Sequence, residues 1–164
     1  MAIAKGRHRF GRYVSNNATA MFPSLHEAVE DAIHANIFPE PWFNQAGGDH
    51  DAIDDYSTHV MGSFECRNPT CSQQGWGSKK IAIQIRRYAG NGYNAVVYKQ
   101  RCKSCKQLGV LRLDEKSYVD RVSYRLKKWA GIPTTPPEYN GDKGGPAHEH
   151  LLCEGCRMGR CNGD

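Results

Sequence analysis

The sequence has no apolar run that approaches the length of a membrane span. A transmembrane helix takes roughly 20 mostly apolar residues, and no such stretch occurs among the 164 residues. The N-terminal segment, MAIAKGRHRF, is basic but has none of the apolar stretch found in a signal peptide. We therefore expect no transmembrane segment and a cytoplasmic or nuclear location, where close cysteine pairs bind metal more often than they form disulfides.

Short catalytic motifs are also missing. The chain contains no G-x-S-x-G, no H-E-x-x-H and no Walker sequence. The triplet His148-Glu149-His150 is not followed by the P-C-x-x-C that a zinc deaminase requires. The Gly-Asn-Gly at residues 90–92 is typical of a hairpin turn rather than a phosphate-binding loop. The sequence thus predicts a protein that is not an enzyme and has no small-molecule substrate.

Positive charge is absent from a long N-terminal stretch and concentrated later in the chain. Residues 14–62 contain eight acidic residues and no lysine or arginine, whereas residues 79–128 contain fourteen lysines and arginines against three acids. This separation favours a surface that binds a polyanion, with an acidic segment that could fold over it. A solvated surface with no such role is the simpler alternative.

The chain has seven cysteines, all between residues 66 and 161. An odd number fits a pure disulfide framework poorly, whereas seven cysteines and one histidine supply the eight ligands of two tetrahedral zinc sites. Two of the pairs have the C-x2-C spacing of a zinc knuckle, and the first pair is spaced C-x4-C. Grouping by neighbourhood predicts two Zn²⁺ ions, the first held by Cys66, Cys71, Cys102 and Cys105 and the second by His148, Cys153, Cys156 and Cys161.

Two alternatives to this grouping remain open. Cys153 and Cys156 could share a metal with an earlier pair, and His150 could replace His148 as the eighth ligand. Eight ligands for two metals leave no open coordination position, which a catalytic zinc needs. The remaining histidines are expected to be solvated: His8, His26, His34, His50 and His59.

The pattern of apolar residues predicts an α+β fold. A small antiparallel sheet stapled by zinc is followed by a helix over 114–131 and a C-terminal zinc knuckle. Strands are expected at 58–66, 79–88, 93–101 and 108–113, and the alternation of Ile81, Ile83 and Ile85 indicates a strand with one buried face. Asp114 is the expected cap of the helix, whose buried stripe would comprise Tyr118, Val122, Leu126 and Trp129.

A helical extension is predicted at the N-terminus. Ser24 and Glu27 are spaced as a capping box, and the helix should end near Ile37 because prolines follow. Residues 44–57 are expected to be an acidic loop. The sequence therefore divides into an N-terminal extension at 1–57 and a zinc-binding domain at 58–162.

Cations alternate with tyrosines on the two central predicted strands. Exposed tyrosines can stack on unpaired bases while lysine and arginine meet phosphates. The leading hypothesis is that this basic aromatic face binds nucleic acid, with RNA or a ribonucleoprotein as the partner. Packing of the tyrosines within the sheet is the alternative for Tyr93 and Tyr98. The predicted contacts are Arg86, Arg87, Tyr88, Tyr93, Tyr98, Lys99, Arg101, Lys103 and Lys106.

Four segments, FECRNPTC, VYKQRCKSC, LDEKSYVDRVSYRLKKWAG and HEHLLCEGCRMGRC, resemble the 3CxxC-type zinc finger family. The resemblance covers roughly residues 58–162, and it departs from the family at the first pair, where C-x4-C replaces C-x2-C. The most specific motif is H-x4-C-E-x-C-x2-G-x-C, which is met by His148, Cys153, Glu154, Cys156, Gly159 and Cys161.

The family includes fungal proteins, receptor-transporting proteins and zygote arrest proteins. Zygote arrest proteins bind messenger RNA, so the resemblance on that side implies RNA binding. Receptor-transporting proteins help membrane receptors to reach the cell surface, so the other side implies a trafficking factor for membrane proteins. A protein-interaction adaptor that docks through the N-terminal helix or the basic face is therefore the competing hypothesis.

Overall fold

The computed structural model describes residues 18–138 and 147–161. Its elements, in chain order, are β1 (Thr19–Ala20), a 3₁₀ turn (Pro23–Leu25), α2 (His26–Ile33), β2 (Trp42–Phe43), β3 (Asp54–Glu65), β4 (Gly75–Arg87), a 3₁₀ turn (Ala89–Asn91), β5 (Gly92–Tyr98), β6 (Val110–Leu113), α3 (Glu115–Trp129), a 3₁₀ turn (His150–Leu152) and α4 (Glu154–Arg157). None of the described helices has the length and apolar character needed to span a membrane.

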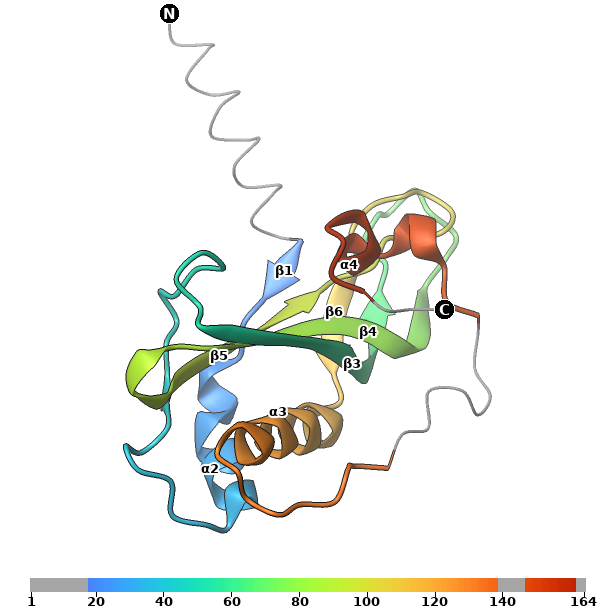
Figure 1. Ribbon diagram of the computed structural model, residues 1–164. Coiled ribbons are helices and arrows are strands. Elements are labelled where there is room, and N and C mark those ends of the chain that lie inside the picture. The colour runs from blue at the N-terminus through green and yellow to red at the C-terminus, as the bar shows by residue number, and fades with distance from the viewer. Residues whose placement is uncertain (1–17, 139–146, 162–164) are drawn as a thin grey trace, which may run out of the picture.

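One sheet organises the described chain. Its strands lie in the order β1-β5-β4-β3-β6, with the short β2 pairing in parallel with β5. All other pairs are antiparallel, so the predicted α+β class with an antiparallel sheet is confirmed. Helices α2 and α3 cover one face of the sheet, and α4 lies on the opposite face (Figure 1). We call these the helix face and the knuckle face.

The helix face carries the main core. Ile81, Ile83 and Ile85 of β4 are fully buried there, as their alternation in the sequence predicts. They form one cluster with Val29 of α2 and Val122 of α3. Tyr118 and Leu126 of α3 are buried in the same cluster, which confirms the predicted stripe on that helix.

A bulge in the β3–β4 pair lies beside the start of α3. Val60 pairs with Ile81 and Gly62 with Ser78, so Met61 of β3 faces two residues of β4, and the extra residue lies on β4. The Met61 N–H donates to Ser117 Oγ at 3.0 Å, and its carbonyl accepts the Asp114 N–H at 2.9 Å. Because these partners lie at the N-terminus of α3, the bulge fixes where the helix begins along the sheet.

The ends of the two predicted helices follow different rules. Asp114 caps α3 as predicted, since its Oδ1 accepts the Ser117 N–H at 3.1 Å. The predicted capping box at Ser24 is wrong: Ser24 lies inside a 3₁₀ turn, and neither that turn nor α2 has a side-chain cap. Helix α2 also ends earlier than predicted, at Ile33, because His34 adopts a left-handed conformation with φ of 51°.

Residues 19–43 share the sheet and the core with the rest of the described chain. β1 and β2 both pair with β5, and Val29 and Ile33 belong to the main core. The predicted boundary between residues 57 and 58 falls inside β3. The last residues of the predicted acidic loop are therefore the first residues of a central strand.

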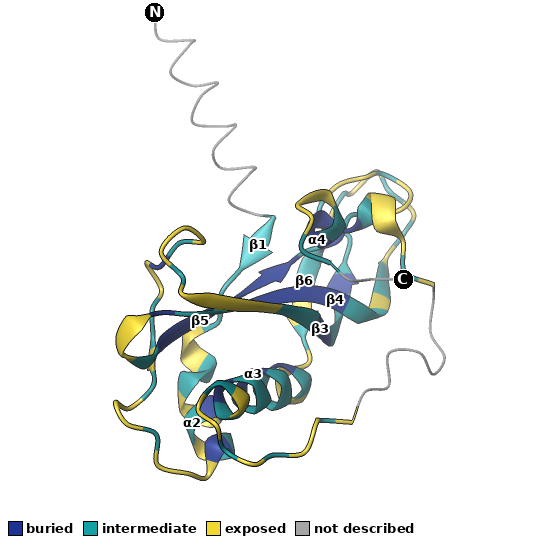
Figure 2. Ribbon diagram, in the orientation of Figure 1, coloured by how far each residue is buried: buried dark blue, intermediate teal, exposed yellow. Residues whose placement is uncertain are grey.

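The knuckle face is buried as well, which corrects the expectation that β4 has one solvated face. Ala82 and Gln84 point away from the isoleucines but are fully buried. Ala82 packs with Val96, Tyr98 and Cys153 in a second cluster. Figure 2 shows the middle of β4 and β5 as buried between the helices and the C-terminal segment. The alternation of residues along β4 correctly predicted which side chains share a face. The segment that covers the second face lies more than fifty residues away in the sequence.

Gly155 allows α4 to lie directly on the sheet. A β-carbon at Gly155 would lie 2.4 Å from the Cβ atom of Ala82. We predict that Gly155→Ala lowers the free energy of unfolding by on the order of 1–3 kcal/mol, because α4 must move away from the sheet. Thermal or urea unfolding of the zinc-loaded protein measures this loss.

Gly77→Ala is the matched control for this change. No atom lies within 4 Å of a β-carbon built at Gly77, so its free energy of unfolding should change by less than about 0.5 kcal/mol. Equal stabilities for the two variants would show that α4 does not rest on Ala82.

Candidate metal centres

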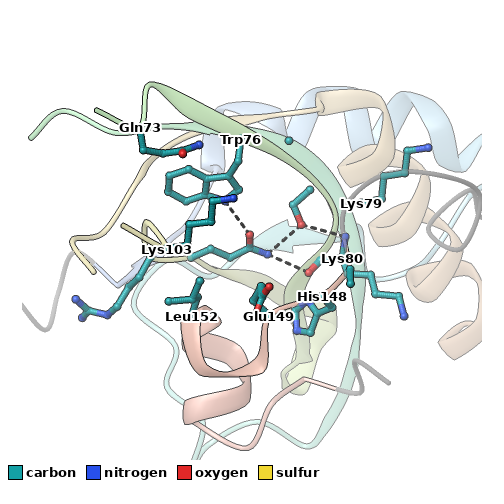
Figure 3. A pocket seen from close by; sticks show the side chains of 13 residues that line it. Gln73, Trp76, Lys79, Lys80, Lys103, His148, Glu149 and Leu152 are labelled. Carbon is teal, nitrogen blue, oxygen red and sulfur yellow. Dashed lines mark hydrogen bonds between the residues drawn. The ribbon is translucent and has the colours of Figure 1, made fainter. Parts of the chain in front are cut away.

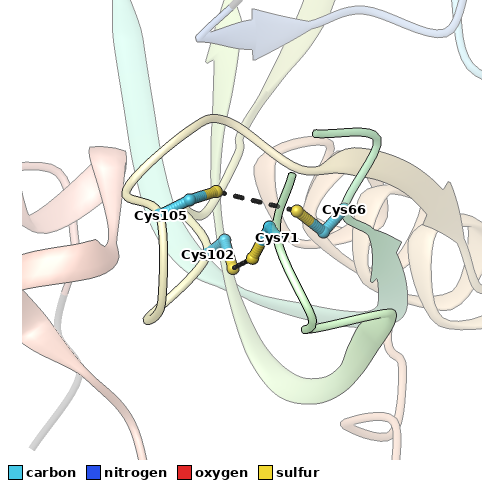
Figure 4. Close-up of side chains that lie close together, drawn as sticks. All are labelled: Cys66, Cys71, Cys102 and Cys105. Atoms are coloured by element: carbon cyan, nitrogen blue, oxygen red, sulfur yellow. Dashed lines mark hydrogen bonds between the residues drawn. The ribbon is translucent and has the colours of Figure 1, made fainter. Parts of the chain in front are cut away.

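Four cysteines from two connections of the chain meet at one end of the sheet (Figure 4). Cys66 follows β3, Cys71 lies in the β3–β4 connection, and Cys102 and Cys105 lie between β5 and β6. The four sulfur atoms lie within 4.8 Å of one another. The Cys66–Cys105 and Cys71–Cys102 sulfur pairs are 3.7 and 3.8 Å apart. A tetrahedron with metal–sulfur bonds of about 2.3 Å separates its sulfurs by about 3.8 Å, so the geometry is that of a zinc site.

Backbone hydrogen bonds hold the second knuckle in shape. The Lys106 N–H donates to the Cys102 carbonyl at 2.8 Å, and the Cys102 N–H donates to the Gln107 carbonyl at 2.8 Å. Lys106 takes a left-handed conformation with φ of 64° to close this reversal. A different hydrogen bond shapes the C-x4-C pair: the Cys71 N–H donates to the Asn68 carbonyl at 3.1 Å. The longer first spacing therefore still brings both sulfurs to the same centre.

The second centre is built from the C-terminal segment. His148, Cys153, Cys156 and Cys161 place their ligand atoms within 4.8 Å of one another. His148 Nε2 lies 3.3 Å from the Cys156 sulfur and 3.6 Å from the Cys161 sulfur. The structure thus groups the ligands by neighbourhood, as predicted, and His148 rather than His150 completes the second set. All seven cysteines are free thiols, so none is used in a disulfide.

Hydrogen bonds favour a thiolate in each cluster. The backbone N–H of Gln107, helped by Asn68, lowers the pKa of Cys105 to about 6. In the second cluster, the hydrogen bond from Cys161 and the backbone N–H of Cys156 lower the pKa of Cys153 to about 5. The same contact with Cys153 raises the pKa of Cys161. Because the thiolate is the form that binds metal, each cluster offers a ready anionic ligand.

The donor sets fit zinc. Four thiolates, or three thiolates and one imidazole, are the ligand sets of closed structural zinc sites. Both clusters also provide four ligands, which is a complete tetrahedral shell. The chain therefore has two Zn²⁺ sites, and the predicted C-terminal zinc knuckle is confirmed.

His59 is a residue near the second centre that the sequence did not reveal. It was expected to be solvated, but it is only 9% exposed, and its Nε2 lies 3.3 Å from the Cys161 sulfur. A metal-bound thiolate can only accept a hydrogen bond, so His59 would donate its Nε2–H to that sulfur. The sequence offers little indication of this contact. His59 lies on the knuckle face, and the segment that covers this face is distant in the sequence.

The prediction that the other histidines are solvated is wrong for one of them and confirmed for two. His26 contacts protein groups instead: its Nδ1 lies 2.6 Å from the Tyr93 hydroxyl, and its Nε2 pairs with Glu30 at 2.5 Å. His34 and His50 are exposed, as predicted. His8 lies outside the described residues.

A short backbone ladder joins the two centres. The Arg101 N–H donates to the Leu152 carbonyl at 2.7 Å, and the Glu154 N–H donates to the Lys99 carbonyl at 3.0 Å. The side chains of Arg101 and Glu154 add an ion pair at 2.6 Å, with the Glu154 side chain only 7% exposed. Removing one partner would leave a buried charge, so the pair fixes the C-terminal segment beside the second knuckle.

The tyrosines predicted to contact nucleic acid are buried. Tyr88, Tyr93 and Tyr98 are each at most 5% exposed, and burial raises the pKa of Tyr93 and Tyr98. The Tyr88 hydroxyl donates to the Gly48 carbonyl at 2.7 Å. The expectation of exposed stacking rings at these positions is wrong, because the sheet is covered on both faces.

The predicted cationic contacts also separate into two groups. Arg86 is largely buried and pairs with Asp49 at 3.6 Å, which places it and Arg87 at the acidic end of β4. Lys99 is half-buried, and burial lowers its pKa. Arg101, Lys103 and Lys106 lie instead beside the first metal centre. Lys103 and Lys106 are exposed.

Each centre should lose its metal independently when one thiolate is removed. We predict that Cys105→Ser and Cys153→Ser each reduce the mass of the folded protein by one zinc ion, and that chelator unfolds the segments around both sites. Structural zinc contributes about 10–16 kcal/mol of apparent binding free energy. Native mass spectrometry measures the metal content, with Ser104→Ala in the same knuckle as the control. Two zinc ions retained by either cysteine variant would contradict the assignment.

The hydrogen bond from His59 should strengthen the second site. We predict that His59→Ala weakens zinc binding at that site about 10–100-fold, the usual cost of losing such a partner. Competition with a chromogenic chelator measures the affinity. His50→Ala is the control, since the His50 side chain is 92% exposed. Equal affinities in the two variants would rule out the donation.

Comparison with known families supports the metal assignment. The family model Zn_ribbon_3CxxC, described as a zinc-binding domain, matches residues 59–159. No curated protein and no solved structure matches the chain. The match spans more than half of the chain and includes seven of the eight ligands, with Cys161 just beyond it. The two tetrahedral clusters and this match together show that the chain belongs to the 3CxxC-type zinc ribbon family.

Proposed function

We propose that the chain is a non-catalytic zinc-binding module that binds single-stranded nucleic acid, RNA above all, in the cytoplasm or nucleus. The binding surface is the zinc end of the molecule. This end comprises the Cys66–Cys71 connection, the Cys102–Cys105 knuckle, the first residues of β4 and, from the C-terminal segment, residues 147–149 and Leu152. The partner is the one predicted from the sequence, but its binding surface lies away from the buried tyrosines.

The observation that carries the proposal is a hollow at the zinc end that four cations line. Lys79 and Lys80 come from β4, Lys103 lies within the second knuckle, and Arg101, which precedes that knuckle, already pairs with Glu154 at 2.6 Å. One acidic side chain, Glu149, lines the same hollow. Lysine and arginine gathered around one hollow are the electrostatic signature of a phosphate-binding surface.

The opposite end of the sheet has the opposite character. Asp49, Asp54 and Asp55 lie where β3 begins and β4 ends. There Asp49 and Asp55 pair with Arg160, and Asp49 also pairs with Arg86. The acidic segment thus covers part of the basic sheet, in line with the charge separation in the sequence, and it does so at the end away from the cations of the hollow.

A protein-interaction adaptor is the second candidate. Phe38 is 90% exposed and Trp42 is 46% exposed. They are sequence neighbours of Ile37 and Pro41, which line a small hollow together with Trp129 and other residues. An apolar side chain of a protein partner could dock there. Recovery of partners that resists nuclease would favour this candidate over RNA binding.

Charge reversal at the second knuckle should weaken RNA binding. We predict that Lys103→Glu/Lys106→Glu lowers affinity for a single-stranded 20-nucleotide RNA at least tenfold. It should also flatten the salt dependence by about 0.7 for each phosphate that the variant no longer neutralises. Fluorescence anisotropy between about 50 and 200 mM salt measures both quantities.

The matched control is Lys127→Glu/Lys128→Glu on α3, which makes the same change in net charge on the other side of the sheet. It should retain near-wild-type affinity. If both double variants lose affinity equally, binding depends on net charge alone, and the zinc end is not the binding surface.

A further inference from the structure

The hollow at the zinc end is a built pocket that lies between the two metal centres. It holds about 160 Å³ and is lined by three segments: β4, the second knuckle and the C-terminal segment. His148, a ligand of the second zinc, forms part of one wall, and Lys103, inside the knuckle of the first zinc, forms part of another (Figure 3). The pocket therefore exists only where both centres hold their segments together.

An aromatic ring with a fixed position forms one wall. Trp76 stacks on Phe64 with ring centroids 5.2 Å apart and an interplanar angle of 17°. Its indole N–H donates to Gln100 Oε1 at 3.1 Å. One face of the ring is thus covered by Phe64, while Trp76 also lines the pocket together with Leu152. A ring held in this way is a ready platform for another planar ring.

The polar floor of the pocket is already satisfied. Gln100 is only 8% exposed, and its Nε2 donates to Ser78 Oγ at 3.0 Å and to the Lys80 carbonyl at 3.2 Å. With its oxygen occupied by Trp76, the carboxamide has little capacity left to read the edge of a base. Recognition must then come from stacking and charge, which tolerate any base.

A second hollow continues the path across β4. It shares Gly77, Ser78 and Lys79 with the pocket and extends to Arg112. Between the two hollows Gly77 leaves open space on the strand, since a β-carbon at Gly77 would meet no atom within 4 Å. A glycine of this kind in a strand allows close approach of another backbone. Lys80 and Lys103 lie on one side of Gly77, and Arg112, which pairs with Glu65 at 3.2 Å, lies on the other. This arrangement suits a phosphate chain that crosses the strand there.

From these observations we infer that the pocket binds one nucleotide of a single-stranded nucleic acid, with its base between Trp76 and Leu152 and its phosphate near Lys80 and Lys103. The inference rests on the proposed function and assigns its recognition subsite. The pocket is smaller than the roughly 300–1,000 Å³ of sites for larger ligands, which suits a single planar ring. Binding should show little preference among the four bases.

Filling the pocket without changing its charge tests the inference. Leu152→Trp places a bulky ring in the pocket, and Leu151→Trp is the matched control because Leu151 is 97% exposed. We expect Leu152→Trp to weaken binding of the 20-nucleotide RNA roughly fivefold to a hundredfold, the usual contribution of one stacked base. Leu151→Trp should bind as the wild type does. Native mass spectrometry establishes that both variants retain two zinc ions.

A small probe tests the ligand class directly. Adenosine 5′-monophosphate added to the zinc-loaded protein should shift the NMR signal of the Trp76 indole N–H, which Trp76→Phe identifies. Adenosine alone and inorganic phosphate alone should each shift it less, because each lacks half of the recognised group. The shift should disappear in Leu152→Trp and persist in Leu151→Trp.

The outcomes separate the subsite from the function. If Leu152→Trp binds RNA normally while Lys103→Glu/Lys106→Glu does not, RNA binding stands and the nucleotide pocket is overturned. If the wild type does not bind RNA, the proposed function fails and the subsite fails with it. A shift of Trp76 by an acidic peptide and not by the mononucleotide would likewise overturn the assignment of a nucleotide.

Discussion

Coordination of two zinc ions is the interaction on which the zinc end of the molecule depends. The segments that carry the ligands contain few apolar residues, and the main core lies on the helix face of the sheet. Each structural zinc contributes about 10–16 kcal/mol, which is comparable to the whole net stability of a typical domain. The first centre ties the β3–β4 connection to the β5–β6 connection, and the second closes the C-terminal segment on itself. The hydrogen bonds and the ion pair between the segments of Arg101 and Glu154 then hold the two centres side by side.

Burial of both faces of the sheet decides where a partner can bind. The C-terminal segment covers Ala82 and Tyr98, and the acidic segment hydrogen-bonds to Gln84 and Asn94. Arg160 joins these two coverings, because it pairs with both Asp49 and Asp55 while its neighbour Cys161 binds zinc. With the broad faces closed, the proposed ligand would meet the sheet at the end beside the metal centres. The two zinc sites hold together the segments that line the basic hollow at that end.

Local patterns predicted part of the fold and most of the metal chemistry. The alternation of Ile81, Ile83 and Ile85 located β4, and Asp114 located the start of α3, because each signal involves neighbouring residues only. The partition of cysteines followed from sequence neighbourhood and held, although the first pair has an unusual spacing. The roles of Tyr93, Tyr98 and His59 could not be predicted in this way. Their environment depends on segments that are distant in the chain. A strand with small and polar residues on one face is predicted from its own sequence to have a solvated face.

The sequence by itself determined the seven cysteine ligands, the class of fold and the separation of charge, whereas the choice of His148 over His150 came from the structure. A zinc ligand is recognised by its chemistry, a strand by its two-residue period and a charged stretch by its composition, and none of these depends on distant contacts. Only the tertiary structure decided which cations gather around one hollow and that Trp76, Lys103 and Leu152 border it. These residues come from three segments that meet because two metal ions and one backbone ladder draw them together. No local sequence pattern predicts contacts between segments that are so far apart in the chain.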